Sequence, residues 1–294
     1  MPGFQRQVVN PLSFYSTPGV MTNPGTHASM LAGIPDDMVS ICQVVQSNLV
    51  HVFWAERMGL ALTEHQKLTL QIRPVVEKLA HMSEENDQPL TVPRPLNKRQ
   101  VGNCRDFSVL LCTILRHKGI PARARCGFGT YFLPDHYEDH WVCEYWNAKL
   151  KRWTMVDSQL DSFQREALHI SFDSLDVPPE GFITGGRAWE MYRTGKADPD
   201  KFGIMDMHGP WFVWGNVVRD FLSLNKIEIL PWDGGWGFLD HRLSDPRPNK
   251  ETLRLYDRVA RMTVNVNNEF EKVLAYYKQE PRLHIPSEWE PARE

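Results

Sequence analysis

The chain has 294 residues, of which 42% are hydrophobic and 23% are charged, and its formal net charge at pH 7 is -3. This is an ordinary globular composition, with enough length to bury a sizeable core. The small net charge gives no electrostatic reason to expect nucleic acid or an anionic membrane as a partner. The N-terminus lacks the basic start and apolar run of a secretory signal, and no apolar run is long enough to span a membrane. We therefore expect no membrane association and a cytoplasmic location.

The cysteines of the chain are odd in number and do not pair by spacing. No C-x-x-C motif occurs, which argues against a disulfide scaffold and excludes a ribbon-type zinc site. A zinc site built from His136, His140 and Cys143 is an alternative, but its spacing matches no familiar structural site. We expect free thiols in a reducing compartment, with no metal and no cofactor. Cys112, Cys126 and Cys143 are expected to be ordinary core residues; the five cysteines are Cys42, Cys104, Cys112, Cys126 and Cys143.

The N-terminal third contains two different kinds of segment. Residues 1–35 are rich in Pro, Gly, Ser, Thr and Asn and are expected to form an irregular arm. Residues 36–100 are predicted to be the helical N-terminal part of the core. A second helix in this part is predicted to begin at Thr63, because Gln66 completes a capping box. The first helix carries an apolar stripe, which consists of Ile41, Val44, Val45, Leu49, Val52 and Phe53.

The central stretch, residues 101–165, changes from one periodicity to another. Apolar residues at helical spacing follow Cys104. The helix is expected to end near His117, because Gly119 offers a C-cap and Pro121 blocks continuation. The period then becomes two, which predicts antiparallel strands at 122–132, 140–147 and 152–160. This order indicates an α+β fold in which the helix packs on an antiparallel sheet.

Residues 166–294 are expected to be Trp-rich loops and C-terminal helices packed on the core, so that the chain forms a single domain overall. Helices are predicted at about 211–225 and 250–277. The tryptophans of this region, Trp211 and Trp232 among them, are expected to be core residues.

An alternative for the same region is a substrate cleft. Tryptophans and glycines on loops between 185 and 240 could form an aromatic lid or cleft lining after the central core. His208 and Asp206 would then also reach the cleft.

Cys104 is the residue that points to chemistry. A thiol at a helix N-terminus is exposed to the helix dipole and to unpaired N–H groups, which favour the thiolate and can bind an oxyanion. Such a thiol needs a base, and the base needs a group that orients it. The predicted hairpin places His140 nearly opposite Asp157, so these two side chains are expected to meet across the strands.

The motifs of this stretch, GNCRDFSVLLCTILRHKGIPARAR followed by DHWVCEYWNAKLKRWTMVD, resemble the core of the transglutaminase-like superfamily. The resemblance covers about residues 101–160 and implies a stand-alone member of bacterial type. It implies a Cys104 nucleophile, a His140 base and an Asp157 orienter in a papain-like fold. The acidic calcium-site loop and flanking β-domains of animal transglutaminases are not apparent. The paired C-x-x-C motifs of the peptide N-glycanases are also missing.

The function expected from these residues is cysteine-dependent acyl transfer. Cys104 would attack an amide or ester carbonyl and form a thioester, and water or an amine would resolve it, so that hydrolysis and transamidation both remain open. The substrate would be a peptide, an amide or a small acyl compound. Alternatives are a glycosylamine-amide hydrolase of the peptide N-glycanase type and a non-catalytic binding module on the same fold. The sequence leaves the oligomeric state open.

Overall fold

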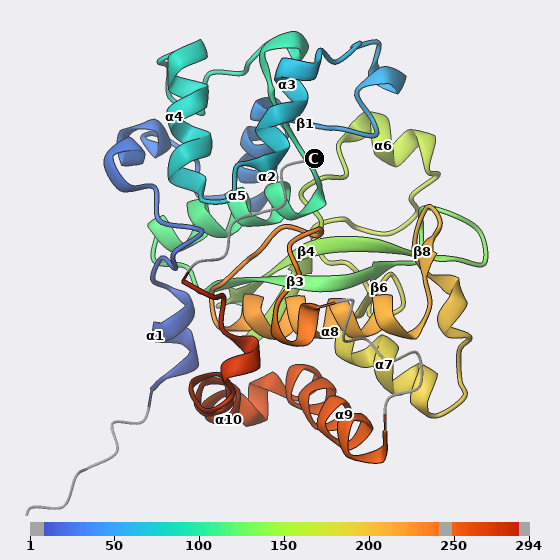
Figure 1. Cartoon of the computed structure of the whole chain (residues 1–294). Helices are drawn as coiled ribbons and strands as arrows, with labels where there is room; N and C mark the ends of the chain where they lie inside the picture. Colours follow the sequence, from blue (N-terminus) through green and yellow to red (C-terminus); the bar gives the residue numbers. More distant parts are fainter. Residues whose placement is uncertain (1–8, 241–248, 288–294) are drawn as a thin grey trace, which may run out of the picture.

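The computed structural model of the protein describes residues 9–240 and 249–287. A mixed β-sheet forms the middle layer, and separate groups of helices cover its two faces (Figure 1). Each face has its own hydrophobic core. The α+β class predicted from the sequence is confirmed. Throughout the described ranges, no helix is both long enough and apolar enough to cross a bilayer.

The central sheet is built around the three strands that alternation predicted. β3 and β4 pair along their lengths in antiparallel fashion, β5 pairs with the C-terminal half of β4, and β7 pairs in parallel with the start of β4. The strand order is β6-β3-β4-β7-β8, with β5 alongside β4. The strands are β3 (Ala122–Gly129), β4 (Tyr137–Asn147), β5 (Arg152–Val156), β6 (Phe182–Thr184), β7 (Phe202–Ile204) and β8 (Met207–His208).

The first helical layer packs around the predicted central helix, α5 (Cys104–His117) (Figure 1). A two-stranded parallel sheet, β1 (Leu49–His51) and β2 (Gln100–Gly102), leads into α5 and so places its first residue. Asn103 caps α5 and forms a capping box with Asp106. The other helices of this layer are α2 (Met38–Asn48), α3 (Glu64–Leu68), which begins after Thr63 as predicted, and α4 (Val75–Glu85).

The second helical layer covers the other face of the sheet (Figure 1). The helix predicted at about 211–225 is confirmed as α8 (Pro210–Leu224). The layer also contains α7 (Gly185–Arg193), α9 (Lys250–Val264) and α10 (Val266–Gln279), while α6 (Ser162–Ala167) lies on the side of the first layer and the short α1 (Pro11–Tyr15) precedes both layers in the chain (Figure 1). Short 3-10 helices are η1 (Gly25–Leu31), η2 (Glu56–Met58), η3 (Thr69–Gln71), η4 (Leu96–Lys98), η5 (Pro199–Lys201), η6 (Gly237–Leu239) and η7 (Pro281–Leu283). Segment boundaries near residues 35, 100 and 165 stay a prediction.

Two predicted helices were too long. The first ends at Asn48, whose side-chain amide donates to the carbonyls of Val44 at 2.7 Å and Leu90 at 2.8 Å. The next residues form β1 because β2 offers a backbone partner, so Leu49, Val52 and Phe53 do not belong to the helical stripe. The C-terminal helix predicted at 250–277 is two helices that meet at Asn265. Asparagine side chains compete for backbone hydrogen bonds, and this junction lies in the sequence VNVNN.

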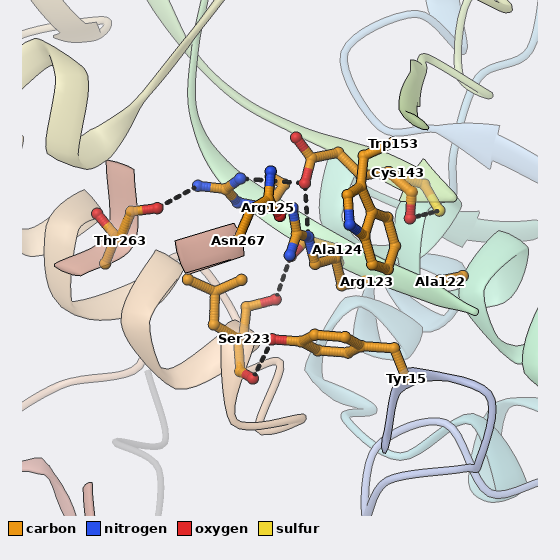
Figure 2. A network of polar contacts seen from close by, with 12 residues as sticks. Tyr15, Ala122, Arg123, Ala124, Arg125, Cys143, Trp153, Ser223, Thr263 and Asn267 are labelled. Atoms are coloured by element: carbon orange, nitrogen blue, oxygen red, sulfur yellow. Dashed lines mark hydrogen bonds and ion pairs between the residues drawn. The ribbon is translucent and has the colours of Figure 1, made fainter. Parts of the chain in front are cut away.

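A buried polar network fastens the second helical layer to the sheet (Figure 2). Arg125 on β3 donates to both carboxylate oxygens of Asp220 on α8 at 2.8 Å each, and its Nη1 lies 3.1 Å from Oε2 of Glu144. Ser223 donates to the carbonyl of Ala124 at 2.7 Å. The network fixes the position of α8, which also forms one wall of the candidate site.

Candidate active site

Cys104 is the first residue of α5 and opens on a cavity of about 810 Å³. Its side chain is 7% exposed. Burial raises the pKa of the Cys104 thiol well above its usual range, and the nearby Asp139 raises it further. Backbone hydrogen bonds from Trp141 and Arg105 act in the opposite direction but do not offset burial. The depressed thiol pKa expected from the helix N-terminus is therefore wrong, because desolvation outweighs the helix end.

His140 and Asp157 are brought together as the sequence predicted. Nε2 of His140 lies 2.8 Å from Oδ2 of Asp157, and both side chains are almost fully buried. His140 lies on β4 and opens on the same cavity as Cys104. Because Nε2 is bound to the carboxylate, Nδ1 is the ring nitrogen left for a proton transfer.

The strand register differs from the prediction by two residues. The hairpin closes at Asn147 and Arg152, and Cys143 pairs with Val156, so Asp157 lies just beyond the end of β5. His140 and Asp157 therefore meet diagonally. A shift of two keeps the side chains on one face, which is why the contact survives.

Tyr131 is a partner of Asp157 that sequence reasoning missed. Its hydroxyl donates to Oδ2 of Asp157 at 2.5 Å, and the N–H of Gln159 donates to Oδ1 at 3.0 Å. Burial by itself would raise the pKa of Asp157, but the contacts with His140, Tyr131 and Gln159 lower it below its usual value. The carboxylate is thus held ionised against the imidazole. Alternation predicted Tyr131 inside the strand at 122–132, but β3 ends at Gly129 and Tyr131 lies in the loop that follows.

The walls of the cavity are mainly apolar and come from distant parts of the chain. Trp211 on α8 and Trp232 line it and are 38% and 46% exposed. The expectation that these two tryptophans belong to the core is wrong, and the cleft-lining alternative holds for them. Other tryptophans of this region are core residues, such as Trp189 and Trp214.

His208 and Asp206 do not reach the cavity, contrary to the cleft alternative. Both lie at the β7–β8 hairpin, and neither is among the residues that line it. Nδ1 of His208 instead lies 3.4 Å from Asp200 on the surface. Their hairpin neighbours Met205 and Met207 line the cavity instead.

Several buried polar groups of the cavity had no sequence signal. His51 on β1 lies near His140, and burial lowers its pKa to about 3, so its imidazole is neutral. Nδ1 of His51 accepts a hydrogen bond from the N–H of Phe53 at 3.2 Å, which assigns the ring proton to Nε2. Glu138 precedes His140 on β4, and burial raises its pKa to about 7. Arg219 reaches the cavity from α8.

The alternative zinc ligands are not brought together. Nε2 of His136 lies 3.2 Å from Glu138, His140 is bound to Asp157, and Cys143 lies in the core with its sulfur 3.3 Å from that of Cys112. Over residues 9–240 and 249–287, no group of three or more His, Cys, Asp or Glu side chains is arranged to hold a metal ion.

One protein-family model matches the part of the chain that carries the candidate residues. The model of the transglutaminase-like superfamily matches residues 54–158, which include α5 and the strands that carry the candidate residues. The resemblance stated from the motifs is confirmed over these residues. This assignment supports a cysteine-dependent enzyme in general and does not distinguish hydrolysis from acyl transfer.

Two solved structures are similar at low identity. A candidate cysteine protease from Cytophaga hutchinsonii has 13% identity and a TM-score of 0.35, covering 60% of this chain and 47% of its own. The transglutaminase of red sea bream has 17% identity and a TM-score of 0.30, covering 47% of this chain and 27% of its own. The chain thus spans less than half of either structure. No curated protein matches it. Likenesses this distant bear on neither activity nor substrate.

Proposed function

We propose that the protein is a cysteine-dependent acyl-transfer enzyme that acts on an amide or ester carbonyl through a thioester on Cys104. The observation that carries this proposal is the cavity shared by Cys104 and the His140–Asp157 pair. A nucleophile, a base and a group that orients the base are the parts that covalent acyl transfer requires. Cys104, His140 and Asp157 fill these roles in that order.

The first half of the reaction forms the thioester. Burial keeps the resting cysteine protonated, so the thiol proton passes to Nδ1 of His140 as sulfur attacks the carbonyl carbon. The carbonyl oxygen becomes an oxyanion in a tetrahedral intermediate. When this intermediate collapses, the bond to the leaving nitrogen or oxygen breaks, and His140 gives its proton to the leaving group. Asp157 stabilises the imidazolium during this transfer.

The second half releases the acyl group. Water or a primary amine attacks the thioester carbon, His140 takes its proton, and the carbon–sulfur bond breaks as that proton returns to Cys104. Asn103 is the side-chain donor that we assign to the oxyanion in both halves. Asn103 lines the cavity, and its buried Nδ2 has no hydrogen-bond partner. The N–H groups at the start of α5 supply further donors.

The test is capture of the acyl-enzyme with p-nitrophenyl acetate. We expect a burst of p-nitrophenol and an acetyl group on Cys104 by intact-mass and peptide mass spectrometry. Cys104→Ser should abolish the burst, whereas the matched control Cys112→Ser, at another buried thiol, should keep it. Absence of both burst and adduct would indicate a binding module and overturn the proposal. Adding a primary amine then separates the two reactions, because transfer yields the acetylated amine and hydrolysis yields acetate.

A further inference from the structure

Arg219 is a buried cation in the cavity that the proposed chemistry does not use. Its side chain is 5% exposed and comes from α8. Nε has no hydrogen-bond partner, and Nη1 makes one long bond of 3.3 Å to Oδ1 of Asn216. Within the described residues, no carboxylate lies at ion-pair distance from it. A desolvated guanidinium with so few partners is costly, which makes its position a candidate for binding an anion.

The other buried arginines have more protein partners than Arg219, although Nε of Arg94 and Nη2 of Arg116 also lack a hydrogen-bond partner. Four of them form ion pairs; these are Arg105 with Asp106, Arg116 with Glu228, Arg123 with Glu144, and Arg125 with Asp220. Arg94 has no ion pair but donates to Asn48 and to the carbonyls of Asn86 and Gln88. Arg219 is therefore the buried arginine of the described chain whose donors the fold leaves largely unused.

Asp139 forms no ion pair with Arg219, although both residues line the cavity. The amide of Asn216 lies between them, since its Nδ2 donates to Oδ1 of Asp139 at 2.7 Å while its Oδ1 accepts from Arg219. Glu138, the other carboxyl group of the cavity, faces Nε2 of His136 at 3.2 Å. Gly215 makes space for the guanidinium, because a Cβ there would lie 2.7 Å from Nη1 of Arg219.

The mouth of the cavity is apolar to an unusual degree. Six large hydrophobic side chains that line it are exposed, from 38% for Trp211 to 70% for Met205. Exposed apolar side chains gathered at one site mark a binding surface. Met205 also has a φ of 53°, a left-handed conformation that side chains such as methionine rarely adopt. The six residues are Phe53, Leu133, Met205, Met207, Trp211 and Trp232.

We infer that the substrate carries a carboxylate, which Arg219 binds, next to an apolar group, which the mouth of the cavity holds. This inference rests on the proposed function and names its substrate class. Two kinds of molecule have a carboxylate next to an apolar group: an N-acylated apolar amino acid and a peptide with an apolar C-terminal residue. Arginine matches a carboxylate with two parallel hydrogen bonds, and the low dielectric of a buried site strengthens them.

The experiment compares electrophiles that differ only in charge. Chloroacetyl-leucine and chloroacetyl-leucinamide each lose chloride when the Cys104 sulfur forms a bond to the methylene carbon. We expect the acid to alkylate Cys104 about tenfold or more faster than the amide at low concentration, a difference typical of a charge-assisted hydrogen bond. Chloroacetyl-glycine should react more slowly than chloroacetyl-leucine. A chloroacetylated tripeptide that ends in leucine tests whether the substrate is a peptide. If it alkylates Cys104 faster than chloroacetyl-leucine does, the substrate is the C-terminal end of a peptide; if it reacts more slowly, the substrate is an N-acylated amino acid.

Three variants test whether Arg219 causes the faster reaction of the acid. Arg219→Met should remove the preference for the acid, and Gly215→Ala should weaken it by displacing the guanidinium without deleting it. Arg57→Met is the matched control, because Arg57 lines the same cavity from an exposed position over Trp54 and should keep the preference.

Three outcomes would overturn the inference. They are equal rates for acid and amide in the native protein, an equal loss of the preference in Arg57→Met, or a preference that survives in Arg219→Met. Iodoacetamide separates this failure from failure of the proposed function. If iodoacetamide labels Cys104 but the acid and the amide react equally fast, only the proposed substrate class is wrong. If the native protein shows neither labelling of Cys104 nor a burst with p-nitrophenyl acetate, the proposed function is wrong.

Discussion

Two buried charge systems of this protein differ in what surrounds them. Arg125 and Asp220 lie between β3 and α8, and every charged atom of Asp220 faces a protein donor. His140 and Asp157 are equally buried, but the imidazole opens on the cavity beside Cys104. The first system joins two layers of the fold, and the second leaves one ring nitrogen available for chemistry.

The comparison shows that burial and ion pairing alone do not identify a functional site. Structural networks perturb pKa values as strongly as catalytic groups do. Glu144, in the first system, has its pKa lowered to about 2 although burial opposes the change, because Arg123 and Arg125 stabilise the carboxylate. What distinguishes the second system is an accessible cavity with unsatisfied donors, such as Nδ2 of Asn103.

The largest effect should come from Cys104→Ala. If the cavity system carries the chemistry, the rate of ester turnover should fall at least about a thousandfold, because no other group can form the thioester. The melting temperature should change little, since one small side chain at the cavity wall is removed. Cys112→Ala is the control: that fully buried thiol should cost about 1 kcal/mol of unfolding free energy with activity kept. Equal loss of activity in both would contradict the assignment.

Asp220→Ala should have a large effect on stability, because it breaks the ion pair that joins β3 to α8. Removing one partner of a buried ion pair leaves Arg125 undercompensated, so the free energy of unfolding should fall by about 3 kcal/mol. Urea unfolding followed by fluorescence measures this loss. Asp176→Ala, which breaks the exposed pair with Arg152, should cost less than about 1 kcal/mol. Equal losses in the two variants would show that the network does not hold the layers together.

Asp157→Asn tests the orienting carboxylate. The side chain keeps its shape but no longer stabilises the imidazolium, so kcat/KM should fall by at least about tenfold. Tyr131→Phe removes only the hydroxyl that donates to Asp157 and should have a smaller effect on rate, within about tenfold. If Asp157→Asn left the rate unchanged, another group would have to orient His140.

The smallest effect is a pH dependence confined to the structural network. The folded-state pKa of Glu144, about 2, lies below its ordinary value of 4.5. Its contribution to stability is therefore complete above about pH 4.5 and is lost as the pH falls toward 2. The stability difference between the native protein and Glu144→Gln should shrink over this window in urea unfolding at stepped pH. A constant difference would mean that Glu144 is not held ionised by the two arginines.

Local sequence predicted the elements better than it predicted their partners. The capping box of Thr63 and Gln66, the start of α5 and the positions of the three strands depend on neighbouring residues and are confirmed, although β3 and β5 end earlier than predicted. The hairpin turn also lies where it was predicted, and Oδ1 of Asn147 stabilises it by accepting from the N–H groups of Lys149 and Leu150. The register was wrong by two residues, because the pairing of Cys143 with Val156 places Asp157 diagonally from His140 and not opposite it.

The sequence by itself determined the α+β class, the superfamily resemblance, and the position of Cys104 at the start of a helix, with His140 and Asp157 following in order. Periodicity and capping encode these features because they act over a few residues. The tertiary structure decided the pKa of Cys104, the contact of Tyr131 with Asp157, and the arrival of Arg219 and the aromatic mouth at the cavity. Those depend on desolvation and on packing between segments far apart in the chain, and no local pattern records either.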